Sequence, residues 1–192
     1  LATDGRKNVS ANFTGIYDVD VKKKRSFIGQ LGFTVRPTSW VELTPLVLYV
    51  HTRDEEAWVL GSTPSPTGRS VFGNRDVDQL DLELRGIVTF TRSLSLQFFS
   101  QVLVARGQYT TYKELVTSTQ LDPYTPPPSF FTTYTPDFNE IVFNANVLLR
   151  WEYLPGSTLY FVWTQGRFDD SRKYATGFGS RLGDAFSLPH ED

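Results

Sequence analysis

Acidic and basic residues recur at every second position in two stretches, and their types and spacing could do chemistry. Asp81, Glu83 and Arg85 form the first run, and Arg150 and Glu152 form the second. Two neighbouring carboxylates are the pair with which glycoside hydrolases cleave their substrates. However, residues two positions apart share a face of any strand. The spacing therefore favours charges that pair with one another on a wet surface over a catalytic pair.

The two histidines, His51 and His190, are the remaining candidates for acid–base chemistry. No Gly-x-Ser-x-Gly nucleophile motif accompanies them, and no spacing of metal ligands surrounds either one. We expect His51 to end a strand as an interfacial residue rather than to act as a base, and His190 to lie in an acidic tail. The sequence thus predicts no catalytic residue, metal site or cofactor. A barrel-embedded hydrolase acting on carbohydrate or lipid stays open as an alternative.

Strict alternation of apolar and polar residues organises the central part of the chain. Residues 79–90 and 94–105 each place apolar side chains on one face of a strand and polar ones on the other. A three-residue loop at 91–93 would pair Leu82 with Val102 and align the two apolar faces. This stretch therefore predicts a β-hairpin with one apolar and one polar face.

The same alternation predicts five further strands, which brings the total to about seven. They cover residues 9–17, 26–35, 41–51, 139–153 and 158–167. Odd-length loops would pair Val35 with Val41 and Leu149 with Trp163, again with the apolar faces together. The sequence therefore predicts an all-β, antiparallel, up-and-down arrangement.

Loop lengths and strand lengths favour a membrane setting for these strands. Tight turns would lie at one end, and long loops at about 52–77 and 106–138 at the other, as in outer-membrane barrels. Strands of about ten residues suit a tilted bilayer crossing, whereas strands of soluble proteins usually have about five or six. We therefore interpret the chain as a segment of a transmembrane β-barrel in the bacterial outer membrane.

The barrel interpretation assigns each face of the strands an environment. We expect the polar face to line the lumen, with Asp81, Glu83, Arg85, Gln97, Gln101, Asn144, Asn146, Arg150 and Glu152. We expect the apolar face to contact lipid, with Leu82, Leu84, Val88, Leu96, Phe98, Val147, Leu149, Trp151, Phe161 and Trp163. A soluble β-sandwich or lipocalin-like binding module, in which the apolar face is the core, is the other alternative.

About seven strands leave open edges, and unpaired backbone groups are costly in lipid. We therefore expect residues 1–192 to be a fragment of a longer barrel whose closing strands lie outside this chain, with a tail at 168–192. The formal charge of −2 argues against nucleic acid as a partner, and the absence of Cys excludes thiolate sites.

The expected partners are outer-membrane lipid and lipopolysaccharide, whose phosphates the basic run at 22–25 could meet, with other envelope proteins or carbohydrate as further candidates. The second long loop is too aromatic for a disordered linker, and could form a plug, dock a partner or stack on sugars. The aromatic residues of this possible binding loop are Tyr109, Tyr112, Tyr124, Phe130, Phe131 and Tyr134.

Two runs carry a resemblance to a known family. They are residues 93–101 with 107–109, and residues 149–159 with 162–165, the latter containing Arg150-Trp151-Glu152-Tyr153 followed by Pro155-Gly156-Ser157. These runs resemble the C-terminal domain of unknown function of Gram-negative outer-membrane proteins. The N-terminal part of those proteins looks like a carbohydrate-binding module of family nine. The resemblance implies a location and a porin-like barrel fold, and no reaction. Our interpretation is a barrel component with a structural, transport or partner-scaffolding role.

Overall fold

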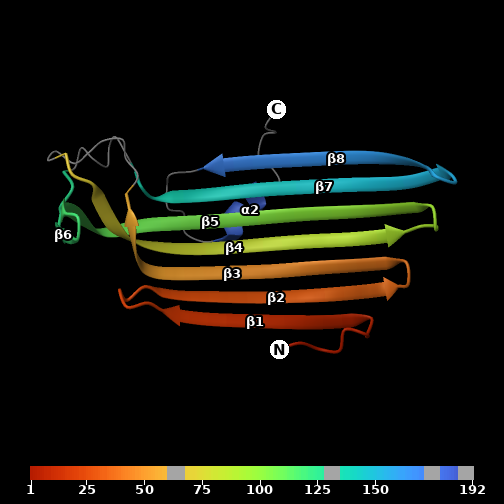
Figure 1. The fold of residues 1–192 in the computed structure, drawn as a ribbon, viewed down its shortest axis with the longest axis horizontal. Helices are drawn as coiled ribbons and strands as arrows, with labels where there is room; N and C mark the ends of the chain where they lie inside the picture. Colours follow the sequence, from red (N-terminus) through yellow and green to blue (C-terminus); the bar gives the residue numbers. More distant parts are fainter. Residues whose placement is uncertain (60–67, 128–134, 171–177, 186–192) are drawn as a thin grey trace.

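The computed structural model describes residues 1–59, 68–127, 135–170 and 178–185. Most of the described backbone is β-structure (Figure 1). The elements are β1 (Val9–Val19), β2 (Arg25–Thr38), β3 (Val41–Trp58), β4 (Val71–Thr89), β5 (Leu94–Thr117), β6 (Gln120–Pro123), β7 (Phe138–Leu154), β8 (Ser157–Asp170) and α2 (Phe178–Asp184).

The strands form one eight-stranded sheet in the order β1-β2-β3-β4-β5-β7-β8, with β6 paired to the far end of β5. Every pairing is antiparallel, so the predicted all-β up-and-down arrangement is confirmed. The sheet is not closed: within the described residues β1 and β8 are its two edges. The tight turns after β2, β4 and β7 lie at the same end, on the right in Figure 1.

The predicted faces hold, whereas two predicted registers are wrong by two residues. Leu82 pairs with Val102 as expected. Val35 pairs with Leu43 rather than Val41, because the ladder is irregular between Val35 and Thr38. A shift of two keeps every side chain on its face, so the alternation could not reveal it.

The last hairpin shows the same effect. Trp163 pairs with Val147 rather than Leu149, and the ladder is irregular between Glu152 and Leu154. Arg150 pairs with Tyr160, so the even register that would mix the two faces is absent, as the sequence predicts.

The strands run further than the sequence predicts, and the described residues hold eight of them rather than about seven. β3 continues to Trp58 and β4 begins at Val71, inside the range predicted as a loop at 52–77. β5 continues to Thr117 and pairs with β6, inside the range predicted as a loop at 106–138. β8 reaches Asp170, so the first residues of the predicted tail are strand. These extensions are rich in charged residues, which is why the sequence predicts loops there. In the structure the charged residues pair across neighbouring strands.

A small core forms where α2 packs on the apolar face of the sheet. Val104 of β5 and Ile141 of β7 are fully buried there, together with Ala185 just after the helix. Arg181 of α2 holds the helix in place through an ion pair with Asp169 (2.6 Å) and a hydrogen bond to the Asn139 carbonyl (3.1 Å). One part of the apolar face is thus covered by this chain.

Candidate functional site

The structure places the predicted lumen-lining residues on one face of the sheet, opposite the predicted lipid-facing residues. Glu83, Gln101 and Asn144 lie in one row across β4, β5 and β7. The Gln101 amide nitrogen donates to Asp81 (2.9 Å), and the Asn144 amide donates to Gln101 (3.4 Å). The polar face therefore carries a hydrogen-bonded chain across three strands.

The remaining charges on the polar face pair locally. Arg85 donates to Glu83 (3.1 Å) and lies over the ring of Phe99, with 4.9 Å between the guanidinium carbon and the ring centroid. Arg150 lies 3.5 Å from Glu152. A depression of about 360 Å³ opens beside Arg85 on this face, and residues from β3 to β8 line it. Charges that satisfy one another agree with the interpretation of a wet surface rather than a catalytic pair.

The opposite face carries a continuous apolar band. On β4 it runs from Leu80 to Val88, about nine residues or about 30 Å of strand. A strand tilted by about 40° would make this band roughly 23 Å tall, close to the apolar height of outer-membrane barrels. Within the band, Val47 of β3, Leu84 of β4 and Leu159 of β8 are 37%, 39% and 41% exposed. Much of the band is therefore open to a partner or solvent in this structure.

The apolar band ends at a single cross-strand row. Phe27, His51, Asp78, Arg106 and Asn139 are successive partners across β2, β3, β4, β5 and β7. In this row a charged or polar side chain stands on the apolar face of four neighbouring strands. The side-chain chemistry of the apolar face therefore changes at a single level across these four strands.

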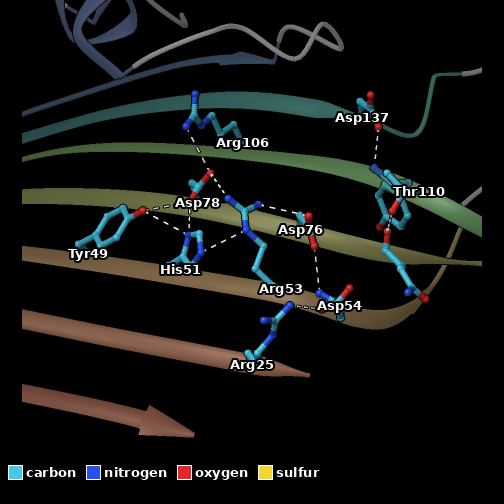
Figure 2. A network of polar contacts seen from close by, with 12 residues as sticks. Arg25, Tyr49, His51, Arg53, Asp54, Asp76, Asp78, Arg106, Thr110 and Asp137 are labelled. Atoms are coloured by element: carbon cyan, nitrogen blue, oxygen red, sulfur yellow. Dashed lines mark hydrogen bonds and ion pairs between the residues drawn. The ribbon is translucent and has the colours of Figure 1, made fainter. Parts of the chain in front are cut away.

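Asp78 is the centre of a polar network at this boundary (Figure 2). Its side chain is only 3% exposed, and its carboxylate accepts hydrogen bonds from Tyr49 (3.0 Å), His51 (2.5 Å) and Arg106 (3.3 Å). Arg53 reaches the same carboxylate at 3.6 Å. A buried carboxylate requires such partners, because an unpaired buried charge costs several kcal/mol.

The electrostatic state of Asp78 follows from these contacts. Burial raises the pKa of the Asp78 carboxyl, but hydrogen bonds from His51 and Tyr49 and the charge of Arg53 outweigh burial. The pKa of Asp78 therefore lies below its ordinary value, and the group is a carboxylate at neutral pH.

His51 is not arranged as a general base. The Arg53 Nε donates to His51 Nε2 (3.1 Å), while His51 Nδ1 faces Asp78. Nε2 therefore accepts and Nδ1 carries the proton, an assignment that rests on the hydrogen-bond pattern. With Nε2 already engaged by a guanidinium, the imidazole has no lone pair for a substrate proton. This geometry counts against the hydrolase alternative.

A second ion-pair network lies beyond this row, towards the long connections. Glu55 pairs with Lys24 (2.8 Å) and Arg75. Burial raises the pKa of the Glu55 carboxyl, but the hydrogen bonds from these two cations outweigh burial, so the pKa lies below its ordinary value. Glu56 pairs with Lys22 (3.2 Å) and with a lysine of β5. These contacts link the β1–β2 connection to β3 and β4, in the segment that the sequence predicts as a loop.

The predicted aromatic binding loop is only partly described. Phe130, Phe131 and Tyr134 lie outside the described residues. Tyr109 belongs to β5, and its backbone N–H donates to Asp137 (2.8 Å). The Tyr112 hydroxyl donates to the Tyr109 carbonyl (3.3 Å). The Tyr112 carbonyl accepts from the Tyr124 N–H (2.9 Å), so backbone hydrogen bonding joins these two residues across the β5–β6 hairpin.

His190 also lies outside the described residues. Among the residues that are described, no group of three or more potential ligands could hold a metal ion. None of the helices in this part of the chain has the length and apolar character needed to cross a membrane.

A family model for a domain of unknown function, DUF5916, matches residues 1–192. The chain belongs to the DUF5916 family. No curated protein and no solved structure matches it. Membership therefore groups the chain with a family whose activity is unknown, and any role for the DUF5916 sheet rests on its own geometry.

Sequence reasoning missed the centre of the boundary network in this DUF5916 sheet. Asp78 and Arg106 fall inside or at the border of the ranges predicted as loops, and His51 is 27 positions from Asp78. A usable signal did exist, because Asp78 and Arg106 continue the alternation of the apolar face in their strands. Aligning the two strands from the predicted hairpin places these residues opposite each other.

Proposed function

We propose that the sheet is part of the wall of an outer-membrane β-barrel that serves a structural, transport or partner-scaffolding role. In this proposal the apolar face contacts lipid and the polar face lines an enclosed aqueous interior. The single observation that carries it is the apolar band that ends on four strands at the row of His51, Asp78, Arg106 and Asn139. A soluble core needs no such boundary, whereas a bilayer imposes one at the level of its headgroups.

Aromatic residues near the opposite end of the band support the same orientation. Trp151 and Tyr153 lie beside the β7–β8 turn, are about half exposed, and contact each other edge to face. Trp40 occupies the β2–β3 turn. Amphipathic aromatic rings gather at membrane–water interfaces. The band would then lie between an aromatic margin at the tight turns and a charged margin at the long connections.

Loop asymmetry supports placing the tight turns on the periplasmic side. The edges β1 and β8 would pair with further strands, since open edges are not tolerated in lipid. By the resemblance described above, the complete polypeptide would also carry a carbohydrate-binding-like domain, which the barrel would hold at the cell envelope. Transport or scaffolding would then be properties of the complete protein.

Cell fractionation tests the proposal. The full-length protein, expressed in a Gram-negative host, should sediment with the outer membrane and resist extraction by salt and alkali. After purification it should stay monodisperse only with detergent, because the apolar band needs a substitute for acyl chains. A protein that is monodisperse without detergent contradicts the proposal.

The packing of α2 favours one competing candidate, a soluble ligand-binding module. In that case the apolar face is an interior, as it already is around Val104 and Ile141. The same experiment separates the two candidates, since the soluble module would remain in the supernatant and need no detergent.

A further inference from the structure

A pocket on the apolar side of the sheet lies where β1, β2 and β3 leave the apolar band. Its volume is about 380 Å³, and its lining residues are Tyr17, Arg25, Ser26, Phe27, His51 and Arg53. Apart from Tyr17, the ionisable residues that line the pocket are arginine and histidine. The acids Asp54, Asp76 and Asp78 hold these bases from outside the lining.

The two guanidinium groups have donors that their ion pairs do not use. Arg25 is 57% exposed and donates through one terminal nitrogen, Nη2, to Asp54 (2.7 Å). A guanidinium has five N–H groups, so the ion pair with Asp54 leaves most of the Arg25 donors unused. Arg53 contacts Asp76 and Asp78 with its terminal nitrogens, each of which carries a second N–H. The acids fix both side chains in place and reduce their net charge.

The floor of the pocket continues into the apolar band. Phe27 lies in the boundary row, and Leu31 follows on the same face of β2, with Phe13 its partner on β1. All three side chains are between about one third and one half exposed. The ring of Phe27 also lies over Gly29, whose missing side chain keeps this strip flat. A ligand with an anionic head and long apolar tails would match both the bases and this strip.

We propose that this pocket binds the phosphate group of a membrane lipid, with Arg25 and Arg53 as donors and the acyl chains lying along Phe27 and Leu31. The inference rests on the proposed function, because it needs this face to contact lipid. Guanidinium groups favour phosphate, since their planar fork donates two parallel hydrogen bonds. Asp54 pairs with Arg25, and both Asp76 and Asp78 contact Arg53, so the tails must supply much of the affinity.

Native mass spectrometry of the full-length protein in neutral detergent tests this site. The probes are phosphatidic acid, phosphatidylcholine and inorganic phosphate. We expect phosphatidic acid to be retained in preference to the other two. Arg25→Gln should weaken its retention about tenfold, the loss expected for a charge-assisted hydrogen bond. Arg25→Lys should lose part of this, because it keeps the charge but not the fork.

Arg36→Gln is the matched control. Arg36 lies on β2 at the other end, is partly exposed, and pairs with one carboxylate, Glu42, at 2.7 Å as Arg25 pairs with Asp54. Retention should not change in this variant. An equal loss with Arg36→Gln would overturn the site in favour of net charge, and retention of inorganic phosphate as strong as that of the lipid would overturn a lipid ligand.

Failure of the site is distinguishable from failure of the proposed function. A protein that associates with detergent but does not select phosphatidic acid refutes the pocket and leaves the barrel standing. A protein that needs no detergent refutes both.

Discussion

Two aspartates three positions apart on β4 illustrate how differently the two faces of the sheet are built. Asp78, on the apolar face, is held by Tyr49, His51 and two arginines. Asp81, on the polar face, is also buried but accepts hydrogen bonds from the amide of Gln101. The apolar face admits a charge only at its margin and only with counter-charges, whereas the polar face accommodates one with a neutral partner. The two faces therefore hold a buried aspartate in different ways.

Of the substitutions that test this comparison, removing the Asp78 carboxylate should lower the free energy of unfolding the most. Asp78→Ala would leave Arg53 and Arg106 without their shared anion, and breaking a buried ion pair in this way costs about 3–5 kcal/mol. Unfolding by guanidinium in detergent, followed by tryptophan fluorescence, measures the loss. Asp4→Ala is the control, because Asp4 pairs with Arg6 at the exposed N-terminal segment. A loss no greater than that of the control would show that the network is not structural.

Placing a positive charge on each face in turn should give the second largest effect, and the effect should differ between the faces. Leu84→Lys and Ile87→Lys alter aliphatic residues of similar exposure on opposite faces of β4. A lysine near the middle of a lipid face costs about 2–4 kcal/mol, and one on a lumen face costs little. Refolding yield and unfolding free energy in lipid vesicles give the difference. Equal effects would argue that both side chains meet the same medium.

Acid should reduce the stability that Asp78 contributes, by a smaller amount than these substitutions. The pKa of Asp78 is lowered in the folded protein, so its stabilisation is complete above its unfolded pKa, near 3.8, and is lost as the pH falls through the lower folded value. The melting temperature should therefore drop below about pH 4 more steeply in the wild type than in Asp78→Asn. Parallel pH profiles would contradict this assignment.

Asp81→Asn should have the smallest effect. The substituted amide keeps an acceptor for Gln101 and leaves no unpaired charge, so we expect a change of about 1 kcal/mol or less. The same unfolding measurement gives this change. Gln101→Leu is the companion variant, because it removes the donor from the same hydrogen bonds. A loss as large as that of Asp78→Ala would remove the distinction between the two faces.

The alternation of side chains sufficed to predict the faces and most strands, because it depends on local periodicity alone. It could not predict registers such as Val35 with Leu43, since a register that differs by two residues leaves the faces unchanged. It also ended β3 too early, because a charged residue such as Glu55 is typical of a loop. The alternation does not reveal that Arg75 lies opposite Glu55 on the next strand. The packing of Ala185 against Val104 and Ile141 depends on contacts across the whole sheet, which no local pattern encodes.

The most direct test of lipid contact uses the absence of cysteine from the chain. Single cysteines at Leu84 and Ile87, labelled with a fluorophore in lipid vesicles, can be quenched by a nitroxide on the acyl chains or by iodide in water. We predict acyl-chain quenching at residue 84 and aqueous quenching at residue 87. Iodide quenching of both labels, with no effect of the acyl-chain nitroxide at residue 84, would contradict the account.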